Sequence, residues 1–266
     1  MKKVIIDCLE KCSAVASYFG GSSYKRFPAW QDAARNSTGY NSPGILEKVY
    51  QAALMVKAGR AVYERDSVLF NEIQYSWPLL AGLMWVVAQS VGELNLVDFG
   101  GALGSSYFQN RQFLKNLRRV RWNIVEQKHY VDVGKKDFES DELRFYYDLQ
   151  SCLLENKPNI VLLSGVLQYL ENPYKLLEQI KRLPFKFIII GRTSFCDKGE
   201  DIIGVQKVPR EIFNASYPCW VFSITKFRDF WGPKEIVTEF YDLDERLASY
   251  SEFKGFIIRR SDENAV

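Results

Sequence analysis

The chain has 266 residues, of which 47% are hydrophobic and 25% charged, and its net charge is +3. These are globular values, and they exclude disordered, collagen-like and disulfide-scaffold proteins. At about 150 residues per domain, the length predicts one large domain or two small ones. The small positive excess is too low for a surface that coats nucleic acid.

Cysteine and histidine usage argues against a disulfide framework and against a metal site. The five cysteines, an odd and scattered set, are Cys8, Cys12, Cys152, Cys196 and Cys219. Cys8 and Cys12 can share one face of a helix, but no second pair of ligands follows them. We therefore predict no metal and a reduced, cytoplasmic protein.

Two segments have features of membrane signals. Residues 1–20 begin with two lysines after the first methionine, but further charges interrupt any apolar core, so no secretory signal is predicted. Residues 73–92 carry no charge for 20 residues, which is the length of a membrane span. This stretch contains several polar residues, and Pro78 suits the first turn of a helix. We expect a buried helix from Pro78 and no membrane span.

Residues 1–92 are expected to form a helical N-terminal extension, a lid packed on the core. The sequence predicts helices over 1–18 and 45–58, separated by segments rich in glycine and other turn formers. The run Tyr63-Glu64-Arg65-Asp66 can close a pocket from the N-terminal side. Alternatively, it forms a surface ion-pair ladder on a helix.

From residue 93 onward, short apolar runs alternate with helical stretches. The runs lie at 94–99, 122–125, 143–147, 160–163, 187–190, 236–241 and 256–259, with helices predicted at 105–117, 131–137 and 173–183. This alternation predicts an α/β domain over 93–266, with a seven-stranded, mostly parallel sheet and helices on both faces. The last two runs lie too close for a full crossover, so we expect them to pair antiparallel.

The aromatic segment at about 193–231 shows little periodicity. We expect it to form an insertion over the carboxyl ends of the strands. Ligands bind at those ends in parallel sheets, so the segment is a candidate cover for a binding site.

The most specific motif is a glycine turn after the first apolar run, where residues 98–104 read Asp-Phe-Gly-Gly-Ala-Leu-Gly. Gly100 permits a tight turn, and the small residues Ala102 and Gly104 let a ligand and a helix approach the backbone. The dinucleotide pattern Gly-x-Gly-x-x-Gly fails, because Ala102 and Ser105 stand where it needs glycine. This mismatch argues against a nicotinamide-dependent enzyme.

A second acid follows this turn. The run 122–125 ends in Glu126, which lies 22 residues beyond Gly104. A carboxylate at that spacing can accept hydrogen bonds from both hydroxyls of a ribose. The two motifs together predict a nucleoside-containing cofactor.

Residues 98–104, Glu126 and the run 160–170 resemble class I S-adenosylmethionine-dependent methyltransferases, over about residues 94–192. Ala102 and Asn159 depart from that family's commonest residues. A narrower resemblance, to a bacterial methyltransferase family linked to surface-polysaccharide or capsule biosynthesis, rests on residues 63–70, 125–127, 164–170, 191–193 and 216–218. The resemblance implies a Rossmann-like methyltransferase fold that binds S-adenosylmethionine without a metal.

The expected cofactor residues are Asp98, Gly100, Gly101, Ala102, Gly104, Glu126, Gln127, Asp148, Ser164 and Gly165. Asp98 is expected at the methionine amino group, whose positive charge favours a carboxylate. Glu126 is expected at the ribose and Gln127 at the adenine. Asp148 either bonds the adenine amino group or caps a helix. Ser164 and Gly165 are expected beside the sulfonium.

Methyl transfer depends mainly on positioning, with proton removal added where the acceptor is an oxygen. The candidates for this work are His129, Arg192 and Tyr217. His129 is either a general base or a solvated surface residue. Arg192 either holds an anionic acceptor or is solvated at a strand end. Tyr217, together with Trp220, either stacks on a sugar or base or packs in the core.

The leading hypothesis is methyl transfer to a small acceptor, an oxygen of a capsule or surface-polysaccharide precursor such as a sugar or a nucleotide-linked compound. The alternative is a non-catalytic binding or scaffold protein that retains the fold. Nucleic acid is disfavoured as a partner, because residues 164–167 lack the Asn/Asp-Pro-Pro-aromatic tetrad of amino-directed DNA methyltransferases. The sequence is compatible with a monomer and with an oligomer.

Overall fold

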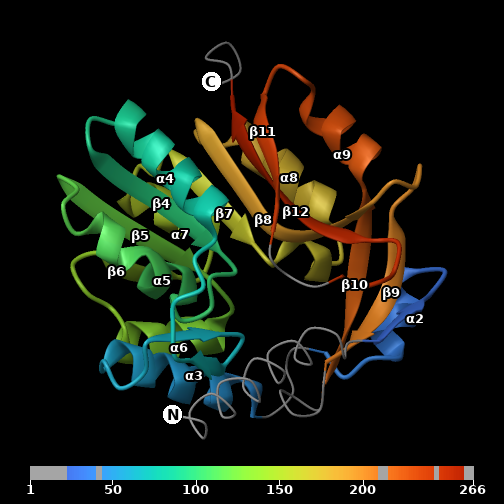
Figure 1. Ribbon diagram of the computed structural model, residues 1–266, viewed down its shortest axis with the longest axis horizontal. Coiled ribbons are helices and arrows are strands. Elements are labelled where there is room, and N and C mark those ends of the chain that lie inside the picture. The colour runs from blue at the N-terminus through green and yellow to red at the C-terminus, as the bar shows by residue number, and fades with distance from the viewer. Residues whose placement is uncertain (1–22, 40–43, 209–214, 243–245, 261–266) are drawn as a thin grey trace, which may run out of the picture.

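A central sheet dominates the computed structural model, which describes residues 23–39, 44–208, 215–242 and 246–260 (Figure 1). Its main part has the strand order β6 (Leu143–Tyr146), β5 (Arg119–Val125), β4 (Glu93–Phe99), β7 (Ile160–Ser164), β8 (Phe187–Cys196), β12 (Glu252–Arg259) and β11 (Ile236–Tyr241). The first five are parallel neighbours, whereas β12 runs antiparallel to both β8 and β11. The predicted seven strands, their mostly parallel arrangement and the antiparallel terminal pair are confirmed.

Apolar residues cover both faces of this sheet, because its strands carry nearly continuous apolar runs. On β4, Leu96 contributes to one core and the adjacent Val97 to the other. The first face is covered by α3 (Ile45–Lys57), α4 (Trp77–Gln89), α5 (Ser105–Leu114) and α6 (Lys128–Asp137). The second face is covered by α7 (Leu149–Glu155), α8 (Pro173–Arg182) and α9 (Ile224–Trp231). Helices on both faces, as predicted, therefore bury the sheet.

The sheet extends beyond the seven strands to ten. The far end of β8 pairs in parallel with β10 (Ser216–Ser223), which pairs antiparallel with β9 (Ile202–Lys207). On β10, buried residues alternate with partly exposed ones, a half-buried strand pattern. The segment 193–231 is therefore more regular than we expected, since it contributes the end of β8, a β-hairpin and α9.

The N-terminal extension contains strands as well as helices, so the expectation of a helical segment was wrong in part. The strand β1 (Ser23–Arg26) pairs antiparallel with β9, and α2 (Trp30–Arg35) follows it. The helix expected from Pro78 is confirmed as α4, with the proline in its first turn. The helix expected over 1–18, together with Cys8 and Cys12, lies outside the described residues.

Residues 63–70 form a β-hairpin of β2 (Tyr63–Arg65) and β3 (Val68–Phe70). The turn residues Asp66 and Ser67 have φ angles of 52° and 69°. Left-handed conformations at both central positions are the geometry of the tightest hairpin turns, and aspartate tolerates them. The expected alternative, an ion-pair ladder on a helix, was therefore wrong.

In the part of the chain that the structure describes, no helix combines the length and the apolar character that crossing a bilayer requires.

Candidate functional site

The carboxyl ends of β4 and β7 meet where the order of the sheet reverses direction. From β4 the chain proceeds through β5 to β6 on one side, and β7 and β8 lie on the other. Such a switch point opens a crevice outside the strand ends, which is where ligands bind in open α/β sheets. The glycine turn follows β4 at this point, and Ser164 ends β7 beside it.

The glycine turn is built on left-handed backbone conformations at Gly100, Ala102 and Gly104, with φ angles of 76°, 48° and 97°. A Cβ atom at Gly100 would lie 2.5 Å from a methyl group of Val166. At Gly104 it would lie 3.3 Å from the side chain of Leu143. Protein packing against the turn thus requires glycine at position 100, where we expected a tight turn, and favours it at position 104, where we expected a ligand and a helix to approach.

Asp98 lies beneath the turn rather than at its surface. Its side chain is 1% exposed, and its carboxylate accepts a hydrogen bond of 2.9 Å from Nε1 of Trp122. Burial raises the pKa of Asp98 to about 7, although the Trp122 hydrogen bond opposes this rise. A Cβ atom at Gly101 would lie 2.5 Å from the Asp98 carboxyl carbon. The placement indicates a supporting role for Asp98, since its carboxylate faces the protein interior.

Glu126 joins the end of β5 to the glycine turn. Its carboxylate accepts hydrogen bonds from the backbone N–H of Ala102, at 3.3 Å, and from that of Gln127, at 2.8 Å. Burial raises the pKa of Glu126, and the two backbone hydrogen bonds oppose the rise. The turn and the acid that follows the second strand, found separately in the sequence, therefore lie in direct contact.

The remaining residues expected at the nucleoside lie around the start of α6 and α7. Gln127 is the exposed N-cap of α6, and the ring of His129, in the first turn, lies 4.9 Å from that of Tyr130. Asp148 is the N-cap of α7, where its side chain accepts a 2.8 Å hydrogen bond from the backbone of Ser151. Of its two expected roles, the helix cap is thus present in the structure.

A pocket lies between the β2–β3 hairpin, the first turn of α5, the end of β7 and the middle of β8. Most of its lining residues are polar or charged by type, and the full set is Tyr63, Arg65, Gln74, Ser76, Leu79, Ser105, Ser106, Gln109, Ser164, Gly191, Arg192 and Asp242. Next to it, Gly165 has a φ angle of 67° and donates a 3.0 Å hydrogen bond to the carbonyl of Gly191. Ser164 and Arg192 therefore share one pocket, although Arg192 lies within β8 and not at a strand end as we expected.

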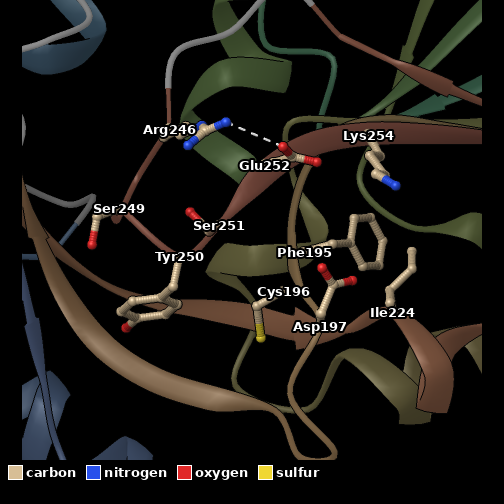
Figure 2. Close-up of a pocket in the computed structure, with 10 residues that line it drawn as sticks. All are labelled: Phe195, Cys196, Asp197, Ile224, Arg246, Ser249, Tyr250, Ser251, Glu252 and Lys254. Carbon is tan, nitrogen blue, oxygen red and sulfur yellow. Dashed lines mark hydrogen bonds and ion pairs between the residues drawn. The ribbon is translucent and has the colours of Figure 1, made fainter.

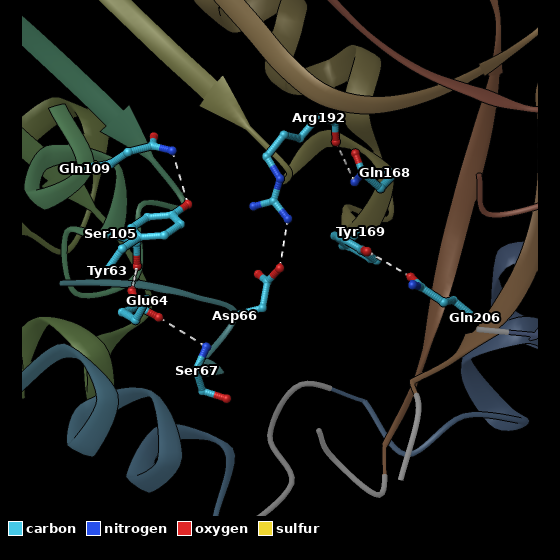
Figure 3. Close-up of polar contacts among 10 residues, drawn as sticks. All are labelled: Tyr63, Glu64, Asp66, Ser67, Ser105, Gln109, Gln168, Tyr169, Arg192 and Gln206. Atoms are coloured by element: carbon cyan, nitrogen blue, oxygen red, sulfur yellow. Dashed lines mark hydrogen bonds and ion pairs between the residues drawn. The ribbon is translucent and has the colours of Figure 1, made fainter. Parts of the chain in front are cut away.

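Arg192 is held in an uncommon conformation at the rim of this pocket. Its φ angle is 49°, its N–H donates to Asp242 at 2.6 Å, and its carbonyl accepts from Gln168 at 2.9 Å. The guanidinium donates to the Asp66 carboxylate at 2.8 Å (Figure 3). Residues in strained backbone conformations persist where their surroundings fix them, and they cluster at functional sites.

Tyr217 and Trp220 do not form one wall, because they lie on opposite faces of β10. Tyr217 is 5% exposed, and its ring lies 6.0 Å from that of Tyr169. Trp220 stacks on Trp30 at 5.8 Å and donates a 3.0 Å hydrogen bond to the carbonyl of Leu170. Of the three catalytic candidates, Arg192 lines the pocket, whereas Tyr217 and His129 are not among its lining residues.

Glu64 belongs to the run 63–66 that we expected at a pocket, but the sequence predicted no separate role for it. It is 3% exposed, and its carboxylate accepts hydrogen bonds from the Ser105 hydroxyl and, at 3.2 Å, from the Ser67 backbone N–H (Figure 3). Burial raises its pKa to about 7, and the Ser105 hydrogen bond opposes the rise. The two turn residues after Arg65 were the available signal, because a hairpin there turns Glu64 toward the protein.

A second pocket lies farther along β8, between its end and the start of β12 (Figure 2). Its charged lining is balanced, with Asp197 and Glu252 against Arg246 and Lys254. Arg246 and Glu252 form an ion pair at 3.2 Å. Among the described residues no group of three or more histidine, cysteine or acidic side chains is arranged to hold a metal ion.

The sequence matches no protein-family model and no curated protein.

Similar solved structures include the N-terminal domain of EvdMO1, crystallised in the presence of S-adenosylhomocysteine and D-fucose. It is 13% identical, with a TM-score of 0.49, and the match covers 81% of this chain and 97% of that one. The 1,6-didemethyltoxoflavin-N1-methyltransferase of Burkholderia thailandensis is 13% identical, with a TM-score of 0.42 and coverage of 89% and 92%. The magnesium protoporphyrin IX methyltransferase of Synechocystis PCC 6803 is 15% identical, with a TM-score of 0.43 and coverage of 80% and 97%. We base the function on this chain's own residues.

Proposed function

We propose that the chain is an S-adenosylmethionine-dependent methyltransferase that acts on a small-molecule acceptor. The observation that carries the proposal is the contact between Glu126 and the glycine turn, where the carboxylate accepts from the Ala102 N–H. A nucleoside ribose bound at this switch point would meet that carboxylate and the backbone of the turn together. The cofactor-binding unit is proposed to begin at residue 93.

The residues present fit such a cofactor. Glu126 is only partly buried and can exchange a backbone partner for ribose hydroxyls, while Gln127 lies exposed beside it. Ser164 ends β7 across the crevice, so the sulfonium end would lie between the glycine turn and Ser164. Asp98 packs directly under Gly101 and accepts a hydrogen bond from Trp122. In our proposal this supporting role replaces its expected contact with the methionine amino group.

The bound cofactor would supply an activated methyl group, so the chain's own residues have to position the acceptor and take up its proton. The polar pocket that Ser164 and Arg192 line is the proposed acceptor site. Glu64 contacts Ser105 at the edge of this pocket, and its pKa of about 7 suits proton uptake at neutral pH. Neither Glu64 nor His129 lines the pocket, and we prefer Glu64 as the proton acceptor because it accepts a hydrogen bond from the lining residue Ser105.

The acceptor atom is proposed to be an oxygen of a sugar or nucleotide-linked precursor of a capsule or surface polysaccharide. The resemblance of residues 63–70, 164–170 and 191–193 to the family linked to those pathways supports this choice. The serine- and amide-rich lining of the pocket suits a hydroxyl-bearing ligand.

Calorimetric titration with S-adenosylmethionine and S-adenosylhomocysteine tests the cofactor. Micromolar binding of both is expected, and it should be followed by transfer from labelled cofactor to a member of a panel of nucleotide sugars and capsule precursors. The absence of binding would refute the enzyme and favour a scaffold that retains the fold. Binding without transfer to any panel member would exclude those acceptors only.

A further inference from the structure

The pocket that Ser164 and Arg192 line carries more positive than negative charge. Arg65 and Arg192 both line it, and Asp242 is the one carboxylate among its described lining residues. Asp242 accepts from the backbone N–H of Arg192 at 2.6 Å and from the Ser76 hydroxyl at 3.4 Å. A concave site with an excess of cations and hydroxyl donors favours an anionic ligand.

Arg192 is positioned by contacts that leave its side chain at the pocket. Its N–H and its carbonyl are both held, by Asp242 and by the amide of Gln168. Gln168 is 1% exposed, so this support is rigid. The Arg192 side chain, in contrast, is 28% exposed. The fold thus fixes the backbone of Arg192 in a left-handed conformation and presents the planar donor group to the pocket.

The group that meets this guanidinium comes from the hairpin. Asp66 lies at the first position of the β2–β3 turn, and its Oδ2 atom is 2.8 Å from Nη2 of Arg192 (Figure 3). The Asp66 side chain is 49% exposed, and it bridges the hairpin to the middle of β8. An exposed ion pair of this kind contributes little to stability, so another oxyanion can displace Asp66 at low cost.

We propose that Asp66 occupies, in the free protein, the place of an anionic group of the second substrate, which therefore carries a carboxylate or a phosphate that binds Arg192. This inference rests on the proposed function for the identity of that substrate as a methyl acceptor. Arrival of the substrate oxyanion at Arg192 displaces Asp66 and frees the tip of the hairpin. Arginine suits this exchange, since its donor fork matches carboxylate and phosphate equally.

Calorimetric titrations with inorganic phosphate and with acetate test the proposal, each with and without saturating S-adenosylhomocysteine. The variants are Asp66→Asn, Arg192→Gln and, as the matched control, Asp32→Asn. Asp32 forms a more exposed ion pair, with Arg35 at 3.0 Å on α2, and its substitution changes the net charge equally. Amide hydrogen exchange at residues 67–70 reports on the hairpin.

We expect Asp66→Asn to tighten anion binding roughly two- to fivefold, the range of one exposed ion pair. Arg192→Gln should weaken it by about tenfold or more, because a charged hydrogen-bond donor is lost. Asp32→Asn should leave it unchanged, and hydrogen exchange at residues 67–70 should accelerate when the anion binds. Binding of phosphate alone, of acetate alone or of both supports the proposal. It also shows whether the site accepts a phosphate, a carboxylate or either group.

Three results would overturn it. In the first, Asp66→Asn lowers stability without tightening anion binding, which would make the ion pair purely structural. In the second, Arg192→Gln binds the anions as the wild type does. In the third, saturating S-adenosylhomocysteine abolishes anion binding, which would assign Arg192 to the cofactor's own carboxylate. Failure of S-adenosylhomocysteine to bind the wild type would refute the proposed function separately, because anion binding to Arg192 is measured without it.

Discussion

The two halves of the carboxyl edge of the sheet are built in different ways. At β4 and β5, the glycine turn, Asp98 and Glu126 come from one short stretch of chain, and their contacts join residues about one strand–helix–strand unit apart. At β7 and β8, Arg192 is held by Asp242 and by Asp66, which are 50 and 126 residues away in sequence. The first half is therefore a local motif, whereas the second half depends on the complete fold.

This difference bears on what each half can do. The half at β4 and β5, which we call the local half, contains backbone groups packed against buried side chains. Asp98, for example, is 1% exposed beneath the turn. The half at β7 and β8, which we call the assembled half, contains partly exposed side chains such as Asp66 and Arg192, for which we propose an exchange of partners. We infer that the first half is preorganised for a constant ligand, and that the second adapts to the ligand that varies between enzymes of one fold.

The largest expected effect comes from Gly101→Val, which challenges the packing of the local half. Its Cβ atom would lie 2.5 Å from the Asp98 carboxyl carbon, so we expect the free energy of unfolding to fall by about 3 kcal/mol. Denaturant unfolding measures it. Gly199→Val is the matched control, because no atom lies within 4 Å of a Cβ at that glycine. A fully stable Gly101→Val variant with weakened cofactor binding would show that residue 101 faces the ligand instead.

The next largest effect concerns Glu126, the residue on which the proposed cofactor site rests. Glu126→Ala should weaken S-adenosylhomocysteine binding by roughly ten- to a hundredfold, since it removes a charged hydrogen-bond acceptor from two hydroxyls. Glu178→Ala, a substitution of an exposed glutamate on α8, is the control in the same titration. If Glu126→Ala binds S-adenosylhomocysteine with wild-type affinity, the ribose lies elsewhere. The half at β4 and β5 would then not be the cofactor site.

How far the sequence predicts each half follows from the same contrast. The continuous apolar runs predicted all seven main strands, and the spacing from Gly104 selected Glu126, the acid that the structure places against the glycine turn. The hairpin at residues 63–70 was missed, because short strands around a two-residue turn leave no periodic pattern. The partners of Arg192 were missed for a different reason. No local pattern relates Arg192 to Asp66 or Asp242, since only the tertiary fold brings them together.

Alternation on β10 illustrates a prediction that simple geometry could have corrected. We expected Tyr217 and Trp220 on one pocket wall, yet residues three apart on a strand point to opposite faces. The error arose because the segment was taken as irregular. Once Ser216–Ser223 is a strand, Tyr217 and Cys219 face one way and Trp220 the other.

A smaller effect, on pH dependence, distinguishes the buried acid of the local half. The pKa of Asp98 is raised from 3.8 to about 7, so between these values the folded protein binds a proton that the unfolded chain releases. The free energy of unfolding therefore falls as the pH rises from about 4 to about 7 and levels off above that. Asp98→Asn should flatten this fall by at least about 1 kcal/mol, as chemical unfolding at several pH values would show. Glu64, also raised to about 7, contributes in the same direction and remains in the variant. Parallel pH curves for the two proteins would contradict the burial of an acidic proton at Asp98.

The smallest effect is expected for Trp220→Phe, which tests whether β10 belongs to the assembled half of the site at all. The Trp220 ring stacks on Trp30 with an interplanar angle of 19°, and its Nε1–H donates to the Leu170 carbonyl. Phenylalanine keeps an aromatic contact and loses the hydrogen bond, so the free energy of unfolding should fall by about 1 kcal/mol. Trp77→Phe is the control, because Trp77 is 60% exposed and its substitution should change stability little. Affinity for S-adenosylhomocysteine and the rate of transfer should stay at their wild-type values, since Trp220 is not among the residues that line the pocket of Arg192. A slower transfer with unchanged stability would instead bring the Trp30 and Trp220 face of β10 into the acceptor site. The acceptor site would then include residues on both faces of β10, the face of Tyr217 and the face of Trp220.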